Sequence, residues 1–261
     1  CLVTGGRVKI GYRVVMKLIR CGATVIVTTR FPADAAKRYA TEKDYEKWSD
    51  RLHIYSLDFR YVPGVEKFCD FISATYPRLD AIINNACQTI RRPPSYYAHL
   101  LDAEKNARLS DSDVDFLLRN QDTFKVQMLS MDSKSLPVGD KAAPAKLEGT
   151  GSGGTSDSST LIAASQNVSS SSANSFSQLS AAEMTQVPIC ADDSHQDSTL
   201  FPSAKLDVNA QQIDLRKTNS WILKQADVET PELLEVFSVN AMAPFIINGR
   251  LRSLLERREG D

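Results

Sequence analysis

Apolar and polar positions over the first 92 residues switch repeatedly between strand-like and helix-like spacing. Short β-branched apolar runs are typical of strands buried on both faces of a parallel sheet. A segment with apolar residues at helical spacing follows each of the first three runs. This alternation predicts an α/β fold with a parallel sheet and right-handed crossovers. The predicted strands are residues 2–5, 23–29, 52–57 and 79–83, and the predicted helices are 11–20, 32–48 and 65–76.

The pattern changes after residue 92. Ser supplies roughly a quarter of residues 130–203, and Phe176 is the one aromatic residue between Phe124 and Phe201. So little apolar area cannot offset chain entropy, which predicts disorder from about residue 130. Helical spacing returns over residues 229–255, where Pro244 should introduce a kink.

These segments predict one interrupted domain. Residues 1–92 form the N-terminal part of a Rossmann-type domain, residues 93–204 an insertion, and residues 205–261 the continuation of the domain with a long helix. The first strand starts without a preceding methionine, and the last residues form a turn-like exit. We therefore expect the chain to be a fragment with an incomplete, doubly wound sheet and a long Ser-rich insertion.

Composition narrows the function classes. The chain has 31 Lys and Arg against 32 Asp and Glu, so no overall charge favours nucleic acid or an anionic membrane. It has no apolar run long enough for a bilayer and no secretory leader pattern. Its five widely spaced cysteines suggest reduced thiols, so we expect a cytoplasmic protein without a metal site. Asp192, Asp193 and His195 form a loose set of ligand types, which is more often a solvated run.

The glycine-rich segment TGGRVKIG lies between a strand end and a helix start. Glycines in such a turn let the backbone approach a pyrophosphate, and the helix N-terminus favours its negative charge. The predicted phosphate-binding residues are Thr4, Gly5, Gly6, Arg7 and Gly11.

Polar residues also follow the other predicted strands. Arg30 comes directly after the second strand, where an acid would bind the ribose 2′-hydroxyl of NAD and a guanidinium would accept the 2′-phosphate of NADP. Asp58 follows the third strand, and Asn84, Asn85 and Ala86 follow the fourth. Ligands of open α/β sheets bind at these strand ends. Each residue also has a plainer interpretation: a solvated charge for Arg30, a turn cap for Asp58 and turn formation for the asparagines.

Five motifs in this order, TGGRVKIG, VTTR, LD, NNA and VN, together resemble the N-terminal half of a short-chain dehydrogenase/reductase (SDR). The resemblance implies a nicotinamide cofactor, contact of Asp58 with adenine, and NADP(H) favoured over NAD(H) because of Arg30. It also matches Asn240 to the catalytic Asn of the family, which holds a water in a proton relay toward a catalytic Lys. The alternative for Asn240 is an ordinary polar position, although Phe237, Val239 and Ala241 beside it are expected to be buried.

The chain departs from the family pattern at several points. Lys9 and Cys87 stand where the family has glycine, and no tyrosine follows Asn240, so the Ser and Tyr-x-x-x-Lys of the family are missing. Cys87 has no identifiable catalytic partner, which favours a passive thiol.

Two functions are therefore compatible with the sequence. The first is an NADP(H)-dependent oxidoreductase acting on a small carbonyl or alcohol, present as a fragment, whose complete form is compatible with a homo-oligomer. The alternative is a non-catalytic nucleotide-binding or interaction protein with a regulated Ser-rich docking tract.

Overall fold

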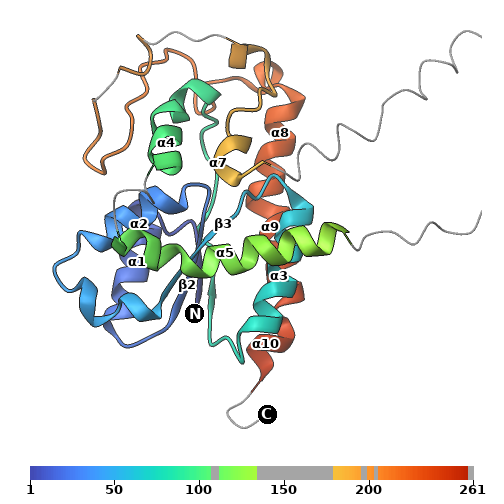
Figure 1. The fold of residues 1–261 in the computed structure, drawn as a ribbon. Helices are drawn as coiled ribbons and strands as arrows, with labels where there is room; N and C mark the ends of the chain where they lie inside the picture. The colour runs from blue at the N-terminus through green and yellow to red at the C-terminus, as the bar shows by residue number, and fades with distance from the viewer. Residues whose placement is uncertain (107–111, 134–178, 195–198, 203–204, 258–261) are drawn as a thin grey trace, which may run out of the picture.

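A four-stranded parallel sheet forms the centre of the molecule (Figure 1). The strands pair in the order β3-β2-β1-β4, and Val3 is aligned with Val27 on one side and with Ile83 on the other. This confirms the predicted Rossmann-type sheet. The strands are β1 (Leu2–Thr4), β2 (Val25–Thr29), β3 (Leu52–Ser56) and β4 (Ile82–Ile83). The computed structural model describes residues 1–106, 112–133, 179–194, 199–202 and 205–257.

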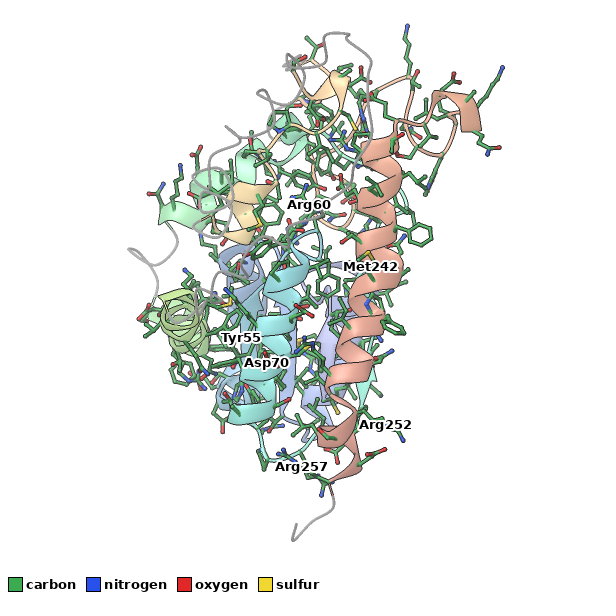
Figure 2. All side chains as sticks on the ribbon, turned by 90° about the vertical axis from the view of Figure 1, so that its right-hand side faces the viewer. Tyr55, Arg60, Asp70, Met242, Arg252 and Arg257 are labelled. Atoms are coloured by element: carbon green, nitrogen blue, oxygen red, sulfur yellow. The ribbon has the colours of Figure 1, made fainter. Side chains whose placement is uncertain are left out.

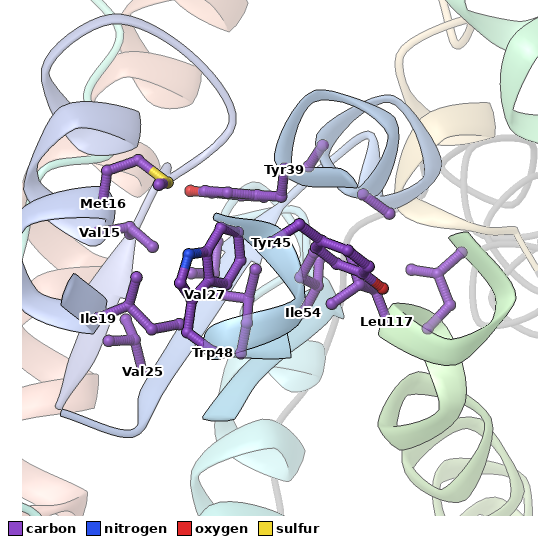
Figure 3. Close-up of a cluster of buried hydrophobic side chains, with 14 of the residues drawn as sticks. Val15, Met16, Ile19, Val25, Val27, Tyr39, Tyr45, Trp48, Ile54 and Leu117 are labelled. Carbon is purple, nitrogen blue, oxygen red and sulfur yellow. The ribbon is translucent and has the colours of Figure 1, made fainter. Parts of the chain in front are cut away.

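Two hydrophobic layers cover opposite faces of the sheet. Because successive strand residues point to opposite faces, Val3 and Val27 belong to one layer, and Leu2 and Ile26 to the other. Helices α1 and α2 cover the first face (Figure 3), and α3 with the C-terminal helices covers the second (Figure 2). The helices of these layers are α1 (Lys9–Arg20), α2 (Pro32–Ala40), α3 (Val62–Thr75), α9 (Ala243–Arg250) and α10 (Arg252–Glu256). Helix α8 (Thr230–Phe237) precedes α9 and contributes no residue to either layer.

The predicted helix over residues 32–48 is wrong beyond Ala40, where α2 ends. Two short 3-10 turns follow, Tyr45–Lys47 and Ser49–Arg51. The turns carry Tyr45 and Trp48 back into the core. Trp48 lies edge-on to both Tyr39 and Tyr45, with ring centroids 6.4 and 5.6 Å apart. Burial of these rings therefore outweighs continuation of the helix.

Helix α5 (Ser112–Ser133) covers the sheet edge formed by β3. Leu117 packs into the layer of α1 and α2, whereas Phe124 packs into the layer of α3. The spacing of Val114, Leu117, Leu118 and Phe124 is helical, and all four side chains are buried. The start of the insertion is thus part of the core.

The predicted disorder between residues 130 and 203 is wrong for residues 179–194. Ser180 begins α7 (Ala181–Met184) with a capping box, in which Ser180 Oγ accepts a hydrogen bond from the Glu183 amide at 3.2 Å. Ala182 is buried with Tyr96 of α4 (Pro94–Asn106). Residues 134–178, which hold most of the Ser-rich tract, lie outside the described residues.

The C-terminal helix changes its winding near Pro244. A π-helical turn, Ser238–Met242, separates α8 from α9. Pro244 has no backbone N–H to donate to the preceding turn, and the wider π-helical turn accommodates this. Phe237 is 58% exposed and Ala241 is exposed, so their expected burial is wrong. Of the helices in the described ranges, none combines the length and apolar character needed to cross a bilayer.

We expect Leu117→Ala to lower the free energy of unfolding by about 2–5 kcal/mol, because the side chain is fully buried and would leave a cavity. Urea denaturation would measure the loss. Phe116→Ala is the matched control, since Phe116 lies next to it on α5 but is 42% exposed. Equal, small effects of the two changes would contradict the packing of α5 in the core.

Candidate functional site

A cleft of about 570 Å³ opens at the carboxyl ends of the strands. Its wall includes the glycine-rich turn after β1 and the loops after β2, β3 and β4. Side chains of the insertion, of the segment before α8 and of the π-helical turn after α8 complete the wall. The residues from these later parts are Tyr96, Tyr97, Gln211, Trp221 and Val239.

The glycine-rich turn is packed too tightly for side chains. Gly5 has φ +68°, and a Cβ there would lie 2.9 Å from Ala86 Cα. A Cβ at Gly11 would lie 2.2 Å from the carbonyl oxygen of Gly5. The buried hydroxyl of Tyr39 donates a 2.5 Å hydrogen bond to the Gly6 carbonyl and holds the turn from the side of α2.

Lys9 takes the position at which the resemblance expects glycine, and its backbone is left-handed, with φ +52°. That conformation is strained for a residue with a Cβ. The side chain is exposed and lines the cleft. Cys87, the other departure, is also exposed at the cleft wall. The turn therefore keeps its shape without this glycine but stores strain at Lys9.

Thr4 and Asn85 join the ends of β1 and β4. Thr4 Oγ1 accepts hydrogen bonds from the amides of Asn85 and Ala86, both at 3.0 Å. The Asn85 amide group donates to the carbonyls of Thr4 and Gly5 at 3.0 and 3.1 Å. Asn84 instead donates to Asn248 and is not part of the cleft wall. The two adjacent asparagines thus differ in position.

Arg30 lies at the wall of the cleft beside aromatic rings. Its Nη2 donates a 2.8 Å hydrogen bond to the hydroxyl of Tyr97, whose ring centroid lies 4.7 Å from the guanidinium carbon. Burial by itself lowers the pKa of Arg30, but Tyr97 and Asp58 more than offset this and raise it. The guanidinium is therefore charged. Arg7, another cation of this wall, is paired with Asp34 at 2.7 Å.

Asp58 is buried at the end of β3 and is held by Arg60. It accepts hydrogen bonds from the Arg60 amide at 2.9 Å and from the Arg60 guanidinium at 2.6 Å. Burial by itself raises the pKa of Asp58, but the Arg60 guanidinium lowers it below its ordinary value. Asp58 is charged and caps its own turn in this structure.

A buried ion-pair network behind the cleft was not predicted from the sequence. Arg91 bonds Asp193 of the insertion and lies 3.3 Å from Glu235 of α8. Asp193 is 6% exposed, and it also accepts hydrogen bonds from the amides of Ile189 and Cys190. The interpretation of Asp193 as part of a solvated run is therefore wrong, because an ion pair and two amides compensate its burial. His195 lies outside the described residues.

Asn240 holds the loop after β4 from the π-helical turn. Its Oδ1 accepts from the Gln88 amide at 2.7 Å, and its Nδ2 donates to the Gln88 carbonyl at 2.9 Å. The side chain is exposed, while Val239 beside it lines the cleft. This reciprocal pair fixes the position of Gln88 in the cleft wall.

Comparison with known proteins finds a family similar to the first part of the chain. Residues 1–107 match the family model of the short chain dehydrogenases. An uncharacterized protein, R665, of Acanthamoeba polyphaga mimivirus is 38% identical over 94 residues, which cover 34% of this chain and 20% of that protein. The chain thus spans a fifth of the length of this curated relative.

Two solved structures overlap with about half of the chain. A short-chain dehydrogenase from Streptomyces avermitilis has 23% identity and a TM-score of 0.30, with 50% of this chain and 45% of that chain covered. The Pseudomonas aeruginosa RhlG/NADP active-site complex has 20% identity and a TM-score of 0.30, with 48% of each chain covered.

We expect Lys9→Gly to raise the free energy of unfolding by roughly 1 kcal/mol, because glycine adopts the left-handed backbone without strain. Lys17→Gly is the matched control and should lower it by about 1 kcal/mol, since Lys17 lies in the regular part of α1. Chemical denaturation of both variants would measure the difference. Destabilisation of similar size in both would show that Lys9 carries no strain.

Proposed function

We propose that this chain, whose residues 1–107 match the family model of the short chain dehydrogenases, binds a nicotinamide dinucleotide in the cleft and prefers NADP(H) to NAD(H). The N-terminus of α1 carries the proposal. It opens beside the glycine-rich turn, no side chain caps it, and its first turn holds no acid. Uncapped amides at a helix N-terminus suit a pyrophosphate.

The proposed roles follow the positions around the cleft. The turn from Gly5 to Gly11 would accept the pyrophosphate, with Arg7 and Lys9 adding positive charge. Arg30 would meet the 2′-phosphate, and Asp58 would lie near the adenine.

The remaining site residues would act by shaping the cleft. Thr4 and Asn85 would set the position of the turn and Ala86, while Asn84 would support the rim through Asn248. Asn240 would position Gln88 at the nicotinamide end.

The proposed activity of the whole protein is hydride transfer between nicotinamide and a carbonyl or alcohol of a small molecule. The nicotinamide supplies or accepts the hydride. Because no tyrosine follows Asn240 in this chain, the group that donates the proton in the family has no counterpart here. The Ser-rich tract of residues 130–203 supports a second candidate, a non-catalytic nucleotide-binding or interaction protein. Oxidation of NADPH by carbonyl compounds would separate the two functions.

The cysteines and the charge of the chain support a proposal for its compartment and its partners. The five free cysteines favour a reducing compartment, for which we propose the cytoplasm. The balanced charge supports a small-molecule partner over nucleic acid or a membrane surface. We also propose that the complete protein forms a homo-oligomer.

We expect NADPH to bind more tightly than NADH and Arg30→Asp to weaken NADPH binding by at least about tenfold, since the change removes a charged hydrogen bond and adds repulsion. NADH binding should change little. Fluorescence titration with both nucleotides would measure the affinities.

Arg252→Asp makes the same charge change far from the cleft, on α10, and should leave both affinities unchanged. Equal affinities of the unmodified chain for NADPH and NADH would contradict the cofactor preference.

A further inference from the structure

Among the arginines of the cleft wall, Arg30 differs in its partners. Arg7 is paired with Asp34, and Arg92 is paired with Asp214. In the part of the chain that the structure describes, Arg30 forms no salt bridge with a carboxylate; the phenol of Tyr97 is its hydrogen-bond partner. Asp58 acts on Arg30 only through space. A guanidinium in a cleft that hydrogen-bonds no carboxylate is suited to an anionic ligand.

Tyr97 covers this guanidinium in two ways. Its hydroxyl accepts the hydrogen bond from Arg30 Nη2, and its ring lies along the guanidinium at 4.7 Å. A phosphate that binds arginine through two parallel hydrogen bonds uses Nη2 together with Nε or Nη1. Arg60 shows the first of these modes on Asp58 in the same molecule, through Nε and Nη2. Nη2 carries two N–H groups, and the Tyr97 hydroxyl competes with a phosphate for one of them.

Helix α4, which carries Tyr97, is held firmly against α2. Glu104 at the other end of the helix accepts hydrogen bonds from the amides of Ala33 and Asp34 at 3.0 and 2.9 Å. The Tyr97 ring stacks on Phe31, with centroids 5.5 Å apart, and Leu100 is buried in the same cluster. The position of Tyr97 therefore does not depend on its hydroxyl.

We propose that Tyr97 is a specificity-determining residue that occupies Arg30 until a 2′-phosphate displaces its hydroxyl. The inference rests on the proposed nucleotide site. A 2′-phosphate that bonds this N–H group of Arg30 displaces the Tyr97 hydroxyl, whereas a nucleotide with a free 2′-hydroxyl leaves the hydrogen bond intact. Tyr97 thereby narrows the preference for NADP(H) over NAD(H) that Arg30 alone would give.

The test uses the adenosine end of the cofactor alone. Calorimetric titration of the whole chain and of Tyr97→Phe would compare adenosine 2′,5′-bisphosphate with adenosine 5′-monophosphate. Phenylalanine keeps the ring over Arg30 and removes the competing hydroxyl, so the bisphosphate should bind about three- to tenfold more tightly. Binding of the monophosphate should not change.

Tyr76→Phe is the matched control, because the Tyr76 hydroxyl bonds His53 and Tyr55 and lies outside the cleft wall. It should leave the ratio of the two affinities unchanged. Weaker or unchanged binding of the bisphosphate in Tyr97→Phe would overturn the proposal, as would failure of both chains to bind it.

Titration with NADPH distinguishes this inference from the proposed function. If Tyr97→Phe strengthens binding of the bisphosphate but NADPH does not bind, the result supports the role of Tyr97 and contradicts dinucleotide binding. If NADPH binds but Tyr97→Phe leaves the affinity for the bisphosphate unchanged, the result supports the proposed function and contradicts the role of Tyr97.

Discussion

The hydrogen bonds between Thr4 and Asn85 are the constraint on which the cleft depends. Strand β4 has only two paired residues, so the ladder alone aligns it weakly with β1. Four hydrogen bonds of 3.0–3.1 Å beyond the strand ends complete the alignment. They also fix the close approach of Gly5 and Gly11, because a Cβ at Gly11 would meet both the Gly5 carbonyl and the Asn85 amide. The turn and the loop after β4 thus form one unit.

The insertion adds structure to this unit at two places. Helix α4 supplies Tyr97 at the β2 side of the cleft and Glu104 at the start of α2. Asp193 pairs with Arg91, which follows the loop after β4 and also contacts α8. Breaking such a buried pair leaves an uncompensated charge, which is costly. The insertion is therefore coupled to the walls of the cleft through buried charges and not only through apolar contacts.

The local features of the fold could be predicted from the sequence. Apolar runs predicted the strands, helical spacing predicted the helices, and the glycines of the turn predicted the junction after β1. Features that depend on distant partners could not. The partners of Arg30 and Arg91 lie 67 and 102 residues away, and no local pattern connects them. The different positions of Asn84 and Asn85 could not be predicted either. Neighbouring residues of an extended chain point in opposite directions, but which of the two faces the cleft depends on where β4 ends.

The most direct test of this account is the affinity of Asn85→Ala for NADPH, with folding checked by circular dichroism. Loss of the two hydrogen bonds from the Asn85 side chain should weaken binding by about tenfold or more, because the glycine-rich turn loses its alignment with the β4 loop. Asn84→Ala is the control and should bind normally, since its side chain contacts Asn248 outside the cleft wall. Unchanged affinity of a folded Asn85→Ala chain would contradict the account.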